Sequence, residues 1–293
     1  MSWLQLRIAV NKPEVEALED ALLASGAVSV TLEDGADDPI LEPGVGETPL
    51  WNQLRVTGLY PSDIHTDLAL QLLAENFPGQ LQHCRWEILE DQPWETLWTE
   101  HYHPIQCGDR LWICPSWREP PNPEAVNLSL DPGLAFGSGT HATTFLCLQW
   151  LDAQPLAGKT VVDFGCGSGI LAIAALLLGA RQVIATDNDP QALLATRDNA
   201  RRNGLDEAQL SVYLPQELPV VKADIVLANI LAEPLMTLAP QLTALTAPGG
   251  QICLSGMIAS QTDAVMSAYR QDFHFAPPLN RDEWFCLVAK KRL

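Results

Sequence analysis

The sequence lacks the long apolar runs and the basic, apolar leader that would direct a protein into or across a membrane. Its longest apolar run, residues 170–180, is shorter than the roughly 18 residues that a membrane-spanning helix needs. The first residues, MSWLQLR, have neither the basic start nor the apolar stretch of a secretory signal. We therefore expect a cytoplasmic protein with no membrane segment.

Paired cysteines and positive charge are also scarce. The seven cysteines are an odd number and none lies in a Cys-x-x-Cys pair, so we expect neither a disulfide framework nor a bound metal ion. There are 17 Lys and Arg residues against 36 Asp and Glu residues, a net charge of −19. Such a surface repels phosphate backbones, so we expect no direct nucleic-acid binding. Charge alone leaves open whether the acidity only keeps the protein soluble or attracts a basic partner.

The chain does contain enough apolar material for one large and one small domain. It has 293 residues, of which 47% are hydrophobic and 18% are charged. In residues 1–89 the order strand, helix, strand occurs twice, which is typical of a small ferredoxin-like α+β domain. Residues 90–102, rich in tryptophan and acids, indicate a helical connector. We expect strands at 3–10, 27–32, 54–59 and 84–89, a helix from Pro13 to the Ser25-Gly26 stop, and a helix at 63–77.

The remaining residues, 103–293, predict a Rossmann-like α/β domain. Apolar strands alternate with helices, which indicates a parallel sheet buried on both faces. Two late strands, 273–276 and 284–290, indicate an antiparallel finish that a plain dinucleotide-binding fold lacks. The other expected strands are 160–164, 182–186, 209–214, 223–228 and 250–255, with helices at 170–178, 190–203 and 231–245.

The strongest chemical signal is the segment Asp163-Phe164-Gly165-Cys166-Gly167-Ser168-Gly169, which joins a buried strand to an apolar helix. Glycines here permit a tight turn and let backbone N–H groups approach a ligand closely. Dinucleotide-binding enzymes have a similar loop, but with the spacing G-x-G-x-x-G. The G-x-G-x-G spacing and the acid before the first glycine favour an S-adenosylmethionine-dependent methyltransferase, with Gly165 and Gly167 as cofactor contacts.

Two polar residues follow strands of the same predicted sheet. Asp187 comes about 22 residues after the first glycine, where an acid accepts hydrogen bonds from a ribose. Asn229 ends a later strand at the edge where ligands of such sheets bind, and its amide can accept from an attacking amine while donating to the cofactor. Each residue by itself could be a turn or helix-cap residue, but together with the glycine loop the cofactor roles are favoured.

A loop rich in Gly, Thr and His, residues 130–144, precedes these elements and leads to a helix expected to begin at Phe145. Its composition predicts a lid over a site, although an ordinary loop could have the same composition. His141 in this loop is a candidate general base, but a lone loop histidine more often has no catalytic role. No motif identifies another base.

Segments 131–141, 163–169 and 229–232 together resemble the bacterial ribosomal protein L-eleven methyltransferase family, and the likeness extends over essentially the whole chain. The resemblance implies cofactor contacts at Thr144, Gly165, Asp187 and Asn229. It also implies that the first domain grips a basic protein of the large ribosomal subunit. The lysine side chains and N-terminal amine of that protein would then be methylated with S-adenosylmethionine as the donor.

Four alternatives stay open. The substrate could be another basic protein, or the chain could be a ribosome-binding protein that keeps the fold without catalysis. A glutamine or adenine N-methyltransferase would have Asn-Pro-Pro-Tyr where this chain has Asn229-Ile230-Leu231-Ala232, so the aromatic face that stacks on a planar substrate is missing. An NAD-dependent oxidoreductase is disfavoured by the glycine spacing and by the late antiparallel strands.

Overall fold

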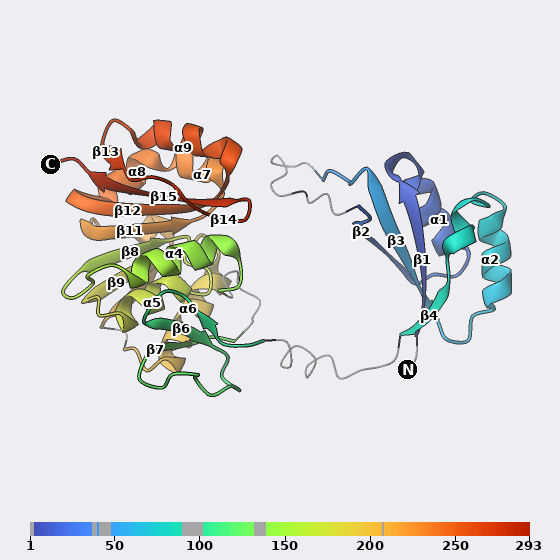
Figure 1. Cartoon of the computed structure of the whole chain (residues 1–293), viewed down its shortest axis with the longest axis horizontal. Coiled ribbons are helices and arrows are strands. Elements are labelled where there is room, and N and C mark those ends of the chain that lie inside the picture. Colours follow the sequence, from blue (N-terminus) through green and yellow to red (C-terminus); the bar gives the residue numbers. More distant parts are fainter. Residues whose placement is uncertain (1–2, 37–39, 41–47, 90–101, 132–138, 207) are drawn as a thin grey trace. The chain divides into compact units, whose positions relative to one another are not determined.

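The computed structural model describes residues 3–36, 40, 48–89, 102–131, 139–206 and 208–293. The chain divides into two compact units, Met1–Leu97 and Trp98–Leu293, which Figure 1 shows in blue to cyan and in green to red. The connector predicted for residues 90–102 lies, up to residue 101, outside the described residues. Within the described residues no helix is long and apolar enough to cross a membrane.

The first unit is a four-stranded antiparallel sheet with two helices. The sheet order is β2-β3-β1-β4, so β1 and β3 are the central strands, as in the predicted ferredoxin-like domain. The elements are β1 (Trp3–Asn11), α1 (Val15–Ala24), β2 (Ser29–Asp34), β3 (Gln53–Pro61), α2 (Thr66–Ala74) and β4 (Trp86–Leu89), with short 3-10 helices at Lys12–Glu14 and Gln80–His83.

Buried and exposed side chains alternate along β1, which shows that only one face of this sheet is covered. In β1 the side chains of Leu6, Ile8 and Val10 are buried, whereas those of Arg7 and Ala9 between them are exposed. The buried residues pack with apolar residues of both α1 and α2 into a single core. The two helices therefore cover the same face of the sheet (Figure 1).

The second unit is built on a seven-strand path in the order β10-β9-β8-β11-β12-β15-β13, with β14 paired to β15. The first five strands of this path run parallel, and β15 pairs antiparallel with β12 and β13, which confirms the Rossmann-like prediction and the antiparallel finish. The strands are β8 (Thr160–Phe164), β9 (Gln182–Thr186), β10 (Leu210–Tyr213), β11 (Ala223–Asn229), β12 (Thr246–Ile258), β13 (Phe273–Phe275), β14 (Leu279–Arg281) and β15 (Trp284–Lys291).

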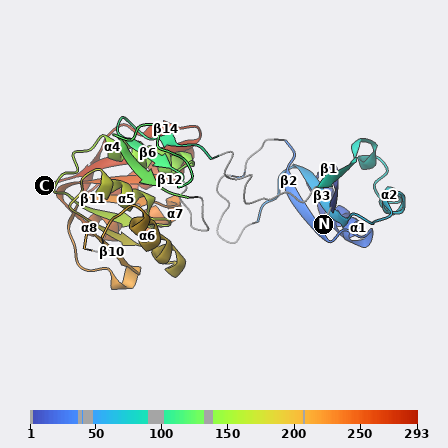
Figure 2. The same cartoon turned by 90° about the horizontal axis from the view of Figure 1, so that it is seen from below.

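Successive residues of these strands enter two different cores. In β8, Val161 packs into one core and Val162 into the other, and all five of its residues are buried. Helices α4, α5 and α6 contribute to the first core and helices α7, α8 and α9 to the second, so the sheet lies between two helical layers (Figure 2). The helices are α4 (Ala142–Asp152), α5 (Ile170–Leu177), α6 (Pro190–Arg202), α7 (Ala232–Thr237), α8 (Ala239–Leu245) and α9 (Thr262–Tyr269), with 3-10 helices at Pro215–Glu217 and Ala259–Gln261.

Several features of this unit differ from the sequence prediction, which contained neither helix α9 nor strand β14. The single helix expected over 231–245 is two helices, α7 and α8, because Pro240 near the start of α8 cannot donate the backbone hydrogen bond that a continuous helix needs. A separate three-stranded sheet was also missed, because its strands are only two to four residues long. These strands are β5 (Ile105–Gln106), β6 (Leu111–Cys114) and β7 (Val126–Ser129), in the order β5-β6-β7.

Candidate cofactor and active site

Three neighbouring parallel strands deliver the polar residues of the site to one edge of the sheet. β8 lies between β9 and β11 and runs parallel to both. The glycine loop follows β8, Asp187 follows β9 and Asn229 ends β11. The strand order reverses at β8, and ligands of open α/β sheets bind at such a switch point, beyond the carboxyl ends of the strands.

The glycine loop needs its glycines for both conformation and space. Gly165, Gly167 and Gly169 have φ values of +78°, +54° and +80°, a region that disfavours residues with a Cβ. A Cβ on Gly165 would lie 2.4 Å from Cγ2 of Ile230, and one on Gly169 would lie 2.7 Å from Cγ2 of Thr196. The loop can therefore fit against both neighbours only as glycine at these two positions.

Asp187 is joined directly to this loop. Its Oδ2 accepts a hydrogen bond from the Gly167 N–H at 2.9 Å, and its Oδ1 accepts from the Asp189 N–H at 3.0 Å. A carboxylate has about four acceptor positions, so both oxygens keep capacity for further donors. The ribose role of Asp187 remains a prediction, and the geometry leaves room for it.

Asn229 meets a residue that is far away in the sequence. Its Nδ2 donates to Oγ1 of Thr144 at 3.1 Å, and Thr144 is completely buried. Thr144 lies inside α4 and not in a loop, because the helix begins at Ala142, where His141 accepts a hydrogen bond from the Thr143 N–H and caps it. The fold thus brings together two of the predicted cofactor residues.

The side-chain oxygen of Asn229 receives no hydrogen bond from the described residues. Its Oδ1 is buried and has no hydrogen-bond partner among the described residues, and the same is true of Oγ1 of Thr186, directly before Asp187. A buried polar atom without a partner costs about 1–3 kcal/mol. Two such atoms at the carboxyl ends of β9 and β11, the strands on either side of β8, fit a site that a polar ligand completes.

Asp163 lies at the end of β8, beneath the loop. Its carboxyl group is buried, and burial raises its pKa to about 7, while the hydrogen bond from the Ala172 N–H at 3.0 Å acts in the opposite direction. That hydrogen bond ties the end of β8 to α5 across the glycine loop. Asp163 therefore supports the loop from within the protein.

His141 contacts neighbouring side chains at the start of α4. Its Nδ1 lies 2.8 Å from Oγ1 of Thr143, and its ring packs edge-on against Trp284 with centroids 4.8 Å apart. Burial lowers the pKa of His141, so the imidazole is neutral at physiological pH. These contacts explain the histidine as a helix cap. Residues 132–138 of the loop predicted as a lid lie outside the described residues.

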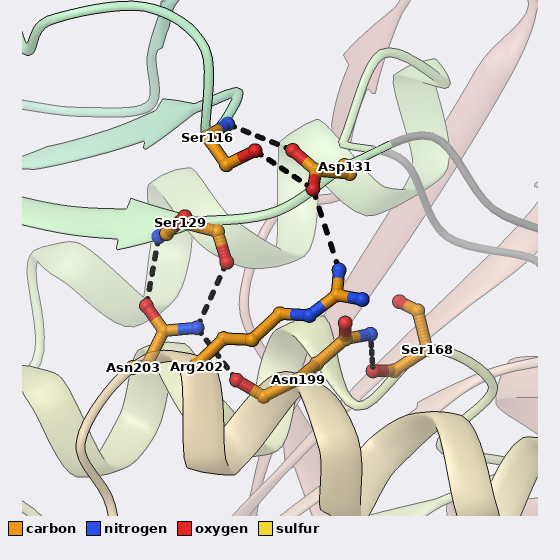
Figure 3. A network of polar contacts seen from close by, with 7 residues as sticks. All are labelled: Ser116, Ser129, Asp131, Ser168, Asn199, Arg202 and Asn203. Carbon is orange, nitrogen blue, oxygen red and sulfur yellow. Dashed lines mark hydrogen bonds and ion pairs between the residues drawn. The ribbon is translucent and has the colours of Figure 1, made fainter.

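The sequence prediction missed Thr196 and Asn199 of α6, which contact the glycine loop, and Asn203, the C-cap residue of α6, which contacts the end of β7. Thr196, Asn199 and Asn203 hydrogen-bond to backbone atoms of Gly167, Ser168 and Ser129 (the Asn199 and Asn203 contacts are drawn in Figure 3). The signal that could have revealed them is their spacing of three and four residues, which places polar groups on one side of a helix.

One group of thiols has to be considered as a metal site. The sulfur atoms of Cys147, Cys253 and Cys286 lie within 4.8 Å of one another, and no other His, Cys, Asp or Glu of the described residues joins them. All three side chains are fully buried in the apolar core. Hydrogen bonds from its two neighbours lower the pKa of Cys286, whereas hydrogen bonds and burial raise that of Cys253. The three thiols pack as a part of the core.

Comparison with known proteins gives a consistent result over the whole chain. The sequence model of the family described as ribosomal protein L11 methyltransferase matches residues 2–292. A protein of that name from Cellvibrio japonicus is 55% identical over 99% of this chain and 99% of its own. One from Saccharophagus degradans is 53% identical over 100% of both chains. A crystal structure of a ribosomal protein L11 methylase from Lactobacillus delbrueckii subsp. bulgaricus is 34% identical, with a TM-score of 0.60, covering 66% of this chain and 100% of that one.

Proposed function

Because the chain belongs to the ribosomal protein L11 methyltransferase family, we propose that it transfers methyl groups from S-adenosylmethionine to amines of ribosomal protein L11. The acceptors would be lysine side chains and the N-terminal amine, and the reaction would take place in the cytoplasm. The observation that carries the proposal is the buried Oδ1 of Asn229, an acceptor with no donor among the described residues at the edge where the cofactor would bind.

The residues proposed to hold the cofactor are those that the fold collects at this edge. Asp187 would accept from the ribose hydroxyl groups, and the glycine loop would approach the cofactor closely with its backbone. Thr144 and Asn229 would lie beside the reacting end. When bound, S-adenosylmethionine supplies the electrophilic methyl group. The proposed contacts are Thr144, Gly165, Gly167, Asp187 and Asn229.

The protein must also bring the acceptor amine to the site in its neutral form. A free lysine amine has a pKa of about 10.4 and is protonated at neutral pH. Transfer into a dry site beside a positive charge disfavours the ammonium form, so the site can promote loss of the proton without a dedicated base. Oδ1 of Asn229 can then accept a hydrogen bond from an amine N–H and orient the lone pair. Orientation of this kind is a major source of rate in group transfer.

The first unit is the proposed binding region for the protein substrate. Residues 1–97 contain 17 acidic and 4 basic residues, a formal charge of −13 out of −19 for the whole chain. A negative field of this size attracts a basic protein and repels nucleic acid. In this proposal residues 1–89 recognise the substrate, residues 90–102 link the two parts, and residues 103–293 carry out the transfer without direct contact to nucleic acid.

The direct test is incubation of the protein with S-adenosylmethionine labelled on its methyl group and a mixture of bacterial ribosomal proteins. We expect label in L11 and its loss when L11 is removed from the mixture. Tandem mass spectrometry of the labelled protein would place methyl groups on lysine and on the N-terminal amine. Label in another basic protein would replace the substrate assignment. Absence of both label and cofactor binding would favour the non-catalytic alternative.

A further inference from the structure

Helix α6 has a polar side that faces the backbone of the glycine loop. Oγ1 of Thr196 donates to the Gly167 carbonyl at 3.1 Å, and Nδ2 of Asn199 donates to the Ser168 carbonyl at 2.9 Å (the latter contact in Figure 3). Two consecutive carbonyl groups of the loop are thus fixed by one helix. Because a trans peptide is planar, a fixed carbonyl also fixes the direction of the N–H group in the same peptide.

The glycine loop has little stiffness of its own, and these contacts hold it in one conformation. Three glycines in five residues give the chain many alternative conformations, so that the bound shape has to be selected by contacts from outside. Thr196 is completely buried and packs so close to Gly169 that a Cβ at Gly169 would overlap it. The loop is therefore pressed against α6 as well as bonded to it.

The C-terminal end of α6 also contacts β7, the strand that ends at Ser129. Asn203 accepts from the Ser129 N–H at 2.7 Å and donates to the Ser129 carbonyl at 2.8 Å, so its amide pairs with the end of β7 as another strand would (Figure 3). Nη1 of Arg202 lies 3.3 Å from Oδ2 of Asp131, which also accepts from the Ser116 hydroxyl. Arg202 is 55% exposed, so this ion pair contributes little and Asn203 provides most of the connection.

We propose that α6 is a positioning element for cofactor binding, in which Thr196 and Asn199 hold the glycine loop and Asn203 holds β7 in register with it. The inference rests on the proposed function, because it assigns these side chains to the loop that would hold the cofactor. The hydrogen bonds of these side chains go mainly to backbone groups, so they are positioning residues. The competing explanation is that their hydrogen bonds stabilise the fold and nothing more.

Asn199→Ala, measured in the full-length protein, separates the two explanations. Its matched control is Asn127→Ala, since Nδ2 of Asn127 also donates to backbone carbonyls, those of Asn122 and Ala125 at 2.9 and 3.0 Å, in the same unit. We expect the Kd for S-adenosylhomocysteine, measured by calorimetry, to rise roughly fivefold to tenfold in Asn199→Ala, the equivalent of one hydrogen bond. The KM for S-adenosylmethionine should rise in parallel while kcat at saturating cofactor stays near the wild-type value.

A second pair of variants separates the role of the Thr196 hydroxyl group from that of the side-chain shape. Thr196→Val keeps the shape of the side chain and loses the hydroxyl, whereas Thr196→Ser keeps the hydroxyl. We expect weaker cofactor binding in the first variant and near wild-type binding in the second. Equal Kd values in Asn199→Ala, Asn127→Ala and the wild type, or equal binding by the two Thr196 variants, would overturn the positioning role. A wild-type protein that binds no S-adenosylhomocysteine would instead overturn the proposed function.

Discussion

Strand β1 of the first unit and strand β8 of the second are both central strands, but their side chains follow different rules. From Leu6 onward β1 alternates between buried and exposed residues, because helices cover one face of its sheet. Every residue of β8 is buried, because helices cover both faces. At β8 the second sheet therefore has no free face, and the polar residues Asp187 and Asn229 lie at the carboxyl ends of β9 and β11.

The two units also differ in their charge. The first unit has 97 residues and a formal charge of −13, and the second has 196 residues and a charge of −6, from 19 acidic and 13 basic residues. The buried oxygen atoms of Thr186 and Asn229, which have no hydrogen-bond partner among the described residues, lie in the second unit. In the proposed function the first unit attracts the partner and the second carries out the chemistry.

Deletion of residues 1–97 should have the largest effect. We expect methylation of L11 to fall by about 1,000-fold, because placing the two reactants together is worth very high effective concentrations. Affinity for S-adenosylhomocysteine should stay close to that of the whole chain, since the proposed contacts all lie in the second unit. Circular dichroism would check that the shortened chain is folded. Undiminished methylation by this chain would remove the substrate role from the first unit.

Asn229→Ala should lower methyl transfer strongly and leave the free energy of unfolding of the second unit nearly unchanged. We expect methyl transfer to fall by about 100-fold, because the amine loses its orienting acceptor. The free energy of unfolding should change by no more than about 1 kcal/mol, since the lost hydrogen bond to Thr144 is offset by removal of an unpaired buried acceptor. Asn280→Ala, at an exposed position of β14, is the control. Wild-type turnover in Asn229→Ala would contradict the assignment.

Asp163→Asn should change how stability depends on pH. Burial raises the pKa of Asp163 from 3.8 to about 7, so the folded protein binds this proton more tightly than the unfolded chain does. The resulting stabilisation is complete below about pH 4 and is lost as the pH rises to about 7. Urea unfolding of wild type and variant across this range measures the effect. Because the Asn side chain resembles the protonated carboxyl, the two proteins should have similar stability near pH 4, and the wild type should lose stability relative to the variant as the pH rises to about 7. Parallel curves would exclude this role.

The smallest effect is expected from a pair of buried tyrosines, one in each unit. The hydroxyl of Tyr60 lies 2.8 Å from Oγ of Ser25, and that of Tyr269 donates to the Leu235 carbonyl at 2.6 Å. Either Tyr→Phe change should cost about 1 kcal/mol. If the two units unfold independently, hydrogen exchange should quicken only in the unit that carries the substitution. Equal changes in both units would mean that they unfold as one.

Patterns that depend on neighbours in the sequence were predicted well. The alternation of residues 3–10 and the continuous apolar run of 160–164 gave the correct sheet types, because burial on one or two faces leaves a direct mark on a strand. The start of α4 was placed three residues late, because the His141 cap uses a side chain that carries no standard capping signal. The short strands β5 to β7 left too few residues for any period to show.

The sequence by itself determined the two sheet types, the glycine loop and the candidate residues Asp187 and Asn229, since each rests on local spacing. Only the tertiary structure decided that Asn229 meets Thr144, and that Asn199 and Asn203 of α6 hold backbone groups of Ser168 and Ser129. The physical reason is that a hydrogen bond requires two groups to lie within about 3 Å. For residues that are distant in the chain, packing of the two helical layers on the sheet sets that distance, and no spacing in the sequence records it.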